Sequence, residues 1–158
     1  QAANAIESLS HVDLLCLDKT GTLTSNQLTL ETLEPLTGSP DELRRLLGDV
    51  VASQADRNRT SVALAASFPG QPRATVEAVP FSSARKWSAI ACDDPTLRGT
   101  FVLGAPEVLA PALRPGWDLT ARVAAWTSQG RRVLLFASRD DPVKLRDSAD
   151  QPISTPLR

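Results

Sequence analysis

The chain has 158 residues, which is enough to bury roughly two thirds of the unfolded surface around one hydrophobic core. Apolar residues make up 42% of it, charged residues make up 22%, and the formal net charge is −1. This balance excludes the strongly basic surface of a nucleic-acid-binding protein and a polybasic membrane patch. Two cysteines and one histidine are too few for a disulfide framework or a four-ligand zinc site. No stretch approaches the roughly 20 apolar residues of a membrane-spanning helix, and no G-x-x-x-x-G-K-[ST] phosphate loop is present.

A mostly apolar run from Val12 to Leu17 is the first patterned segment, and it stops at Asp18. It predicts a buried strand that delivers a carboxylate into a small polar loop. Cys16 lies inside this run and Cys92 ends another apolar run, so we expect two buried thiols. Four leucines between residues 28 and 36 alternate irregularly with Thr and Glu and predict an extended segment.

Two helices are predicted next. Ser39 is a favourable N-cap, Pro40 suits the first helical position and Glu42 completes a capping box, so a helix is expected from about Pro40 to Ala55. Thr60 can cap a second helix, which should end where Pro69-Gly70 forces a turn.

The second half of the chain is rich in β-type segments. They are predicted at residues 75–79, 86–92, 98–103 and 133–137. The turn residues Asp93-Asp94-Pro95 predict that the second and third of these form an antiparallel hairpin.

Short helices are expected between the last two strands. One opens at Pro106 and is interrupted by Pro111, and another is capped by Asp118 and stopped by Gly130. Residues 138–158 are polar, contain prolines and predict a linker or frayed tail. The predicted fold class is α+β, with an antiparallel sheet flanked by helices.

The polar loop after the first apolar run carries the chemistry. A carboxylate at a strand end can attack the terminal phosphate of ATP if a cation and backbone amides neutralise the transferred group. A lone Asp-Lys-Thr would more simply be an N-capping Asp in a turn, but seven residues in this order favour the catalytic interpretation. The run is Asp18-Lys19-Thr20-Gly21-Thr22-Leu23-Thr24.

This run resembles the phosphorylation signature of P-type ATPases at every position, and Ile6-Glu7-Ser8-Leu9 resembles the segment that precedes it in cation pumps. The resemblance implies that Asp18, Lys19 and Thr20 are catalytic, and that Asp18 and Thr20 hold magnesium in the full-length enzyme. The wider phosphatase superfamily has a general-acid Asp at the position of Thr20. Its replacement implies slow hydrolysis of the phosphoaspartate, which suits a transport intermediate.

A second segment, Phe81-Ser82-Ser83-Ala84-Arg85-Lys86, resembles the part of the nucleotide-binding domain in which an aromatic ring stacks on adenine. The resemblance implies nucleotide-binding roles for Phe81, Ser83 and Lys86, with the lysine near the phosphates. An exposed Phe offers an apolar face to a purine, and a lysine offers a mobile point charge to a polyphosphate. The residues alone leave open a core Phe81 and a solvated Lys86.

The run from Leu103 to Glu107 resembles the Lys-Gly-Ala-Pro-Glu loop of calcium-type and related pumps. Leu103 replaces the lysine that helps to line the adenine pocket. Gly104 and Ala105 keep the small residues that let backbone approach the base.

Arg132 lies where the family has an arginine that bridges the nucleotide phosphates toward the phosphorylation loop. The alternative for Arg132 is a surface arginine at the start of a strand. Residues 56–60 are expected to add a polar group to the pocket, without a match to one family role.

These resemblances imply a division of the chain into three parts. Residues 1–25 would be an N-terminal fragment of the phosphorylation domain, 26–140 the nucleotide-binding domain, and 141–158 a return linker or tail. The chain has no methionine and lacks the family's later Gly-Asp-Gly-x-Asn-Asp loop, so we expect an excised segment that binds nucleotide without transporting ions.

The full-length enzyme would couple ATP hydrolysis, through an aspartyl-phosphate, to cation transport, with ATP and Mg²⁺ as cofactors and calcium suggested by the Gly-Ala-Pro-Glu resemblance. This portion would lie on the cytoplasmic side of a plasma membrane. Its partners would be ATP and the remaining phosphorylation, actuator and membrane domains, without nucleic acid. Two alternatives are a standalone phosphatase or phosphotransferase of the same superfamily and a non-enzymatic nucleotide-binding or interaction module.

Overall fold

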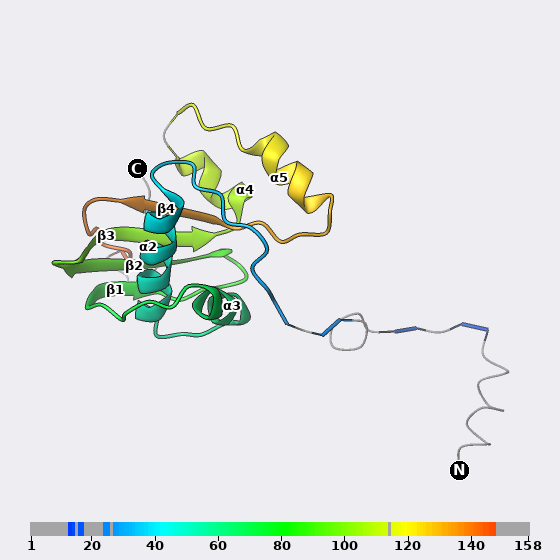
Figure 1. Cartoon of the computed structure of the whole chain (residues 1–158), viewed down its shortest axis with the longest axis horizontal. Coiled ribbons are helices and arrows are strands. Elements are labelled where there is room, and N and C mark those ends of the chain that lie inside the picture. The colour runs from blue at the N-terminus through cyan, green and yellow to red at the C-terminus, as the bar shows by residue number, and fades with distance from the viewer. Residues whose placement is uncertain (1–12, 15, 18–23, 26, 114, 148–158) are drawn as a thin grey trace, which may run out of the picture.

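The centre of the molecule is a four-stranded antiparallel sheet in the order β1-β2-β3-β4 (Figure 1). The computed structural model describes residues 13–14, 16–17, 24–25, 27–113 and 115–147. The strands are β1 (Thr75–Val79), β2 (Trp87–Asp94), β3 (Leu97–Gly104) and β4 (Leu135–Arg139). Each strand pairs with the next along the chain, so the sheet is a meander and the predicted α+β class is confirmed.

The β2–β3 hairpin forms where the turn residues predicted it. Asp94 pairs with Leu97, and the Asp94 carboxylate accepts hydrogen bonds from the backbone N–H and the hydroxyl of Thr96 at 2.9 and 2.6 Å. These two bonds close the loop locally and fix the register of the two longest strands.

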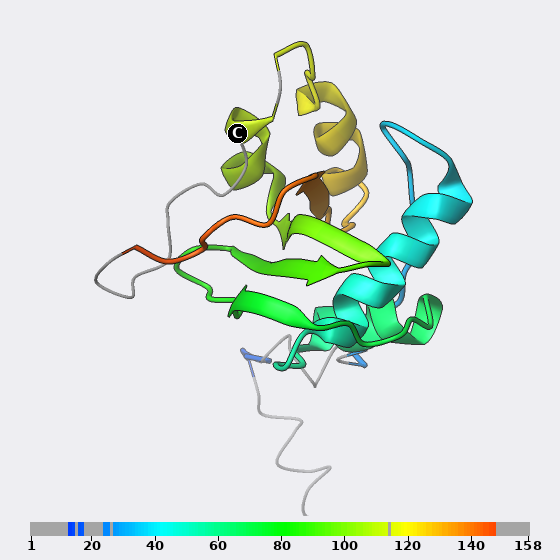
Figure 2. The ribbon, with the colours of Figure 1, turned by 90° about the vertical axis from the view of Figure 1, so that its left-hand side faces the viewer.

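Helices α2 (Pro40–Ser53) and α3 (Arg59–Ser67) cover one face of the sheet (Figures 1 and 2). Helix α2 begins at Pro40 as predicted and ends at Ser53, two residues before the predicted Ala55. Ser39 Oγ accepts from the Glu42 N–H at 3.2 Å, as expected of the N-cap. The N-cap of α3 is Asn58 rather than Thr60. Asn58 Oδ1 accepts from the Ser61 N–H at 3.0 Å. This bond supplies a partner to one of the first-turn N–H groups, which have no carbonyl partner within the helix.

The other face of the sheet is covered by α4 (Pro106–Leu109), the short 3₁₀ helix η2 (Ala110–Ala112) and α5 (Thr120–Thr127). Trp87 and Val102 pack here against Leu109, whereas Ile90 and Phe101 pack against Val50 of α2. Alternation along each strand therefore divides the core into two layers. Pro111 does not end the helical segment but lies inside η2. The Asp118 carboxylate accepts from the Thr120 N–H, although the N-cap residue of α5 is Leu119 rather than Asp118. Gly130 follows the end of α5 with a φ of 77°.

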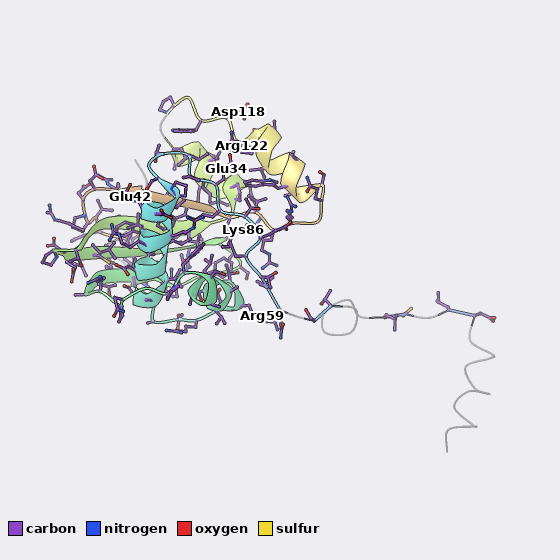
Figure 3. All side chains as sticks on the ribbon, in the orientation of Figure 1. Glu34, Glu42, Arg59, Lys86, Asp118 and Arg122 are labelled. Atoms are coloured by element: carbon purple, nitrogen blue, oxygen red, sulfur yellow. The ribbon has the colours of Figure 1, made fainter. Side chains whose placement is uncertain are left out.

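The leucine-rich segment of residues 27–36 is not a strand. Leu30, Leu33 and Leu36 pack on the core, and an ion pair joins Glu34 to Arg122 of α5 (Figure 3). A second ion pair joins Glu31 to Arg131, which follows α5. The pattern correctly indicated an extended chain, but side chains rather than strand pairing hold it.

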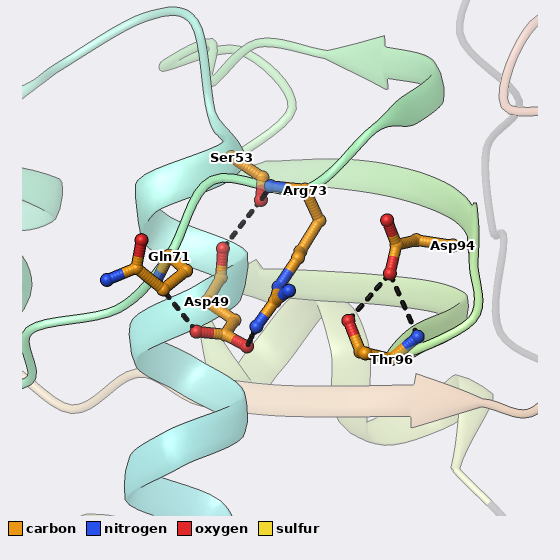
Figure 4. A network of polar contacts seen from close by, with 6 residues as sticks. All are labelled: Asp49, Ser53, Gln71, Arg73, Asp94 and Thr96. Atoms are coloured by element: carbon orange, nitrogen blue, oxygen red, sulfur yellow. Dashed lines mark hydrogen bonds and ion pairs between the residues drawn. The ribbon is translucent and has the colours of Figure 1, made fainter.

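A polar cluster centred on Asp49 ties α2 to the segment that leads into β1 (Figure 4). The carboxylate is 4% exposed, accepts from the Gln71 N–H at 2.8 Å and forms an ion pair with Arg73 at 3.1 Å. A Cβ on Gly70 would come within 2.0 Å of the Gly48 carbonyl carbon, so the backbones meet there without side chains between them. This cluster fixes the end of α2 relative to β1.

The two ends of the described chain depart from prediction in opposite directions. Leu14 and Leu17 are 79% and 51% exposed and Cys16 is exposed, so the predicted buried strand and buried Cys16 thiol are wrong for these residues, whereas Cys92 is buried as expected. Leu14, Cys16 and Leu17 stay exposed because no strand in the described part of the chain pairs with them. At the other end Ser138 and Arg139 belong to β4 and Leu145 is fully buried, so the predicted tail is wrong at these positions.

Within the described residues, no helix has the length and apolar character needed to cross a membrane.

Candidate functional site

A hollow lies at the edge of the sheet where three segments meet. It is lined by residues 54–56 and 58 after α2, residues 78–81 at the end of β1, and residues 88–90 of β2. Its empty space is about 340 Å³, including the part that opens to solvent. The Asp49 cluster joins the C-terminal end of α2 to the segment before β1, and the first two lining segments follow these two parts of the chain.

Phe81 stands at the rim of this hollow. It follows β1 after Pro80, and 48% of its surface is exposed. Phe81 is therefore not a core residue, and its ring offers an apolar face beside the hollow.

The hollow also contains polar groups. Ser88 of β2 is 7% exposed, and its Oγ accepts a hydrogen bond of 3.4 Å from Nε2 of Gln54. Asp56 and Asn58, which belong to the segment expected to add a polar group, line the same hollow. Sequence reasoning missed Gln54 and Ser88. A serine inside the apolar run Trp87-Ser88-Ala89-Ile90 was the available signal, because such a residue needs a partner when the strand is buried.

Lys86 lies in the turn before β2 and has φ of 62°, an uncommon conformation for a residue with a side chain. Its N–H donates to the Ser82 carbonyl at 2.7 Å, and its own carbonyl accepts from the Ala105 N–H at 2.9 Å. Its Nζ lies 3.0 Å from Glu107 Oε1. The hydrogen bond from Lys86 lowers the pKa of the Glu107 carboxyl from its ordinary value of 4.5. Lys86 is thus held beside α4 and does not line the hollow.

Gly104 and Ala105 meet Lys86 at the end of the sheet. Gly104 pairs with Trp87, and a Cβ on Gly104 would approach the Trp87 Cβ to 2.5 Å and the Lys86 carbonyl oxygen to 2.7 Å. Glycine is therefore required for the packing of β3 on β2, whether or not a ligand binds. The Leu103 side chain is 9% exposed and packs with leucines of α2 and α3.

The remaining predicted residues are dispersed. Ser83 and Arg132 are exposed, and Arg132 lies three positions before β4, at the end of the sheet where Leu135 pairs with Gly104. Asp18, Lys19 and Thr20 lie outside the described residues. The fold therefore brings together Lys86, Gly104 and Ala105 at the end of the sheet. Phe81 lies apart from them, beside the hollow that residues 88–90 of β2 help to line.

Comparison with known proteins identifies relatives over most of the chain, although no family model matches it. The calcium-transporting ATPase CtpE of Mycolicibacterium smegmatis is 36% identical over 149 residues, which are 94% of this chain and 17% of that protein. The probable cation-transporting ATPase exp7 of Streptococcus pneumoniae is 37% identical over 140 residues, 87% of this chain and 17% of that protein. Plasma membrane ATPase 1 of Saccharomyces cerevisiae is 54% identical over 44 residues, 27% of this chain. The chain spans 17% of the length of each of the first two relatives.

Proposed function

Because the chain is homologous to one segment of the P-type cation-transporting ATPases, we propose that it is a nucleotide-binding domain of such an enzyme, joined to part of the phosphorylation domain. The domain boundaries that we propose are residues 1–25 for the phosphorylation fragment, 26–140 for the nucleotide-binding domain and 141–158 for the return segment. The observation that carries the proposal is the half-exposed ring of Phe81 at the rim of a hollow with polar groups.

ATP would place its adenine in the hollow with one face on Phe81. A purine is flat and apolar on its faces and polar at its edges, which matches an aromatic rim and a polar floor. The phosphates would extend toward the end of the sheet, where Lys86 and Arg132 supply positive charge and Ser83 supplies a hydroxyl. Gly104 and Ala105 would let the backbone approach the nucleotide.

The whole enzyme would use Asp18 as a nucleophile, in accordance with the relatives' names as cation-transporting ATPases. The carboxylate oxygen would form a bond to the γ-phosphorus of ATP while the bond from that phosphorus to the oxygen of ADP breaks. Magnesium held by Asp18 and Thr20 would neutralise charge on the transferred group, and Lys19 would add a further positive charge. We propose that this step drives cation transport, with calcium as the first ion to test, and that the domain faces the cytoplasm.

A titration of the chain with ATP, followed through backbone amide shifts, tests the binding proposal. We expect the largest shifts at Phe81 and at residues 54–56, with smaller shifts at Lys86 and Gly104. Adenosine should move only the first group, and inorganic triphosphate only the second. Shifts that are absent from residues 54–56 and 81 at millimolar ATP would contradict nucleotide binding in this hollow.

A separate experiment tests the whole enzyme. The longer protein should form an acid-stable, hydroxylamine-sensitive phosphoenzyme from γ-labelled ATP, and Asp18→Asn should abolish it because the amide cannot attack as a carboxylate does. The 158-residue chain by itself should form none, because its sequence contains no Gly-Asp-Gly-x-Asn-Asp loop to hold magnesium. Equal labelling of Asp18→Asn would remove Asp18 from the mechanism.

A further inference from the structure

The hollow contains a polar pair, Gln54 and Ser88, to which the proposed function assigns no specific contact. Gln54 Nε2 donates to the oxygen of the buried Ser88 hydroxyl at 3.4 Å. We propose that Gln54, oriented by Ser88, recognises the amino edge of adenine and makes the site prefer ATP over nucleotides with a carbonyl at that position. This inference rests on the proposed binding of a purine in the hollow.

The backbone of Gln54 is fixed independently of any ligand. Gln54 is the C-cap residue of α2, and its N–H donates to the Val51 carbonyl at 3.3 Å. Ser53, the residue before it, is bonded to the Asp49 carbonyl and to the Arg73 N–H, as part of the cluster that joins α2 to the segment before β1. The backbone of Gln54 is therefore held in place at the edge of the hollow that its side chain lines.

In the structure the nitrogen of the Gln54 amide, Nε2, is directed to the Ser88 hydroxyl. With Nε2 directed to Ser88, the carbonyl oxygen of Gln54 is the group left to meet a ligand, and among the described residues it has no hydrogen-bond donor. Asp56 lines the same hollow and presents only acceptor oxygens when ionised. Asn58 also lines the hollow, and its Oδ1 already accepts from the Ser61 N–H.

The carbonyl oxygen of Gln54 and the carboxylate of Asp56 would distinguish the two kinds of purine. Adenine carries an amino group at its six position, which donates to a carbonyl or a carboxylate, and the amide oxygen of a glutamine is such an acceptor. Guanine and hypoxanthine carry a carbonyl oxygen at that position. Bringing that oxygen against Gln54 and Asp56 would leave acceptors facing one another without a proton between them.

Affinities for ATP and inosine triphosphate test the inference, because the two nucleotides differ at the six position of the base. We expect the chain to bind ATP about tenfold more tightly than inosine triphosphate. Gln54→Leu should lower ATP affinity about fivefold and leave inosine triphosphate affinity nearly unchanged. Gln54→Glu should keep most of the preference because a carboxylate still accepts from the amino group. Ser88→Ala should reduce the preference about twofold to threefold.

Gln129→Leu is the matched control. Gln129 is an exposed glutamine at the end of α5, where its Nε2 bonds to the Ala125 carbonyl, so its loss should change neither affinity. Thermal unfolding of each variant establishes that the fold is kept, and Gln54→Glu supplies a second variant at the same position if Gln54→Leu does not fold.

The outcomes separate this inference from the proposed function. If neither nucleotide shifts the amides around Phe81, the nucleotide-binding proposal fails. If both nucleotides bind there but the unaltered chain shows no preference, or Gln54→Leu and Gln54→Glu lower both affinities equally, the recognition role of Gln54 is overturned while nucleotide binding stands.

Discussion

The Nζ of Lys86 lies 3.0 Å from Oε1 of Glu107, and this pair connects the turn before β2 to the first turn of α4. Both side chains are more than half exposed, so the pair itself contributes little to stability. The pair matters for ligand binding, because the Glu107 carboxylate already forms an ion pair with Lys86, the residue that we propose to bind the phosphates.

Glu107→Gln should therefore raise ATP affinity about twofold, since the amide no longer competes with phosphate for Lys86. Adenosine affinity should not change. The effect should be constant from pH 8 to pH 5, because the lowered pKa keeps Glu107 ionised there, and it should disappear as the pH falls through that pKa. Calorimetric titrations at several pH values measure this, with Glu42→Gln on α2 as the control. An equal gain for adenosine would show that Glu107 acts on the fold rather than on the phosphates.

Leu103→Lys restores the residue type that the family resemblance places there. The Leu103 side chain is nearly buried among leucines of α2 and α3, so an ammonium group should lower the free energy of unfolding by about 1–3 kcal/mol. The same ammonium, at the position that pairs with Ser88, should raise ATP affinity several-fold. Denaturant unfolding and titration measure the two effects, and Leu103→Met should leave both nearly unchanged. Weaker or equal ATP binding would argue that the nucleotide lies differently from the family arrangement.

The Asp49–Arg73 ion pair should matter more than any exposed pair. Arg73→Ala removes the cation that pairs with the Asp49 carboxylate, which is 4% exposed. We therefore expect the free energy of unfolding to fall by about 2–4 kcal/mol. Arg44→Ala removes an exposed i, i+3 pair with Asp41 and should cost less than about 0.5 kcal/mol. Similar losses from the two variants in urea unfolding would contradict the role of Asp49 as an anchor of α2.

The two cysteines should react at very different rates. Burial raises the pKa of the Cys92 thiol to about 11, and the thiolate is the reactive form. Cys16 is exposed. At pH 8 a colorimetric thiol reagent should modify one cysteine quickly and the second only after denaturant is added. Rapid modification of both thiols in the folded chain would be inconsistent with a buried Cys92.

Much of the fold could be predicted from local signals. The capping residues before α2 and the turn residues of the β2–β3 hairpin act within a few residues of one another, so the sequence contains their whole physical cause. The ends of an element are harder to predict where contacts with distant segments determine them. Strand β4 begins two residues later than predicted, because its pairing with β3, and not its own composition, determines where the strand starts.

The site divides in the same way. Phe81 was predicted from its neighbours in the chain, whereas Gln54 and Ser88 are 34 residues apart and become partners only when α2 packs on the sheet. The run from Val12 to Leu17 has the pattern of a buried strand, yet Leu14 and Leu17 are exposed because pattern alone supplies no partner.

The most direct test of the account is the affinity of Phe81→Ala for ATP, measured by titration calorimetry beside the unaltered chain. We expect the unaltered chain to bind with a dissociation constant of about 1 mM or somewhat below, and the variant to bind at least about fivefold more weakly, since stacking of a base on an aromatic ring contributes about 1–3 kcal/mol. Trp117→Ala removes another exposed aromatic ring, 42% exposed and outside the hollow, and should leave the affinity unchanged. A folded Phe81→Ala variant that binds ATP as tightly as the unaltered chain would contradict nucleotide binding on this ring.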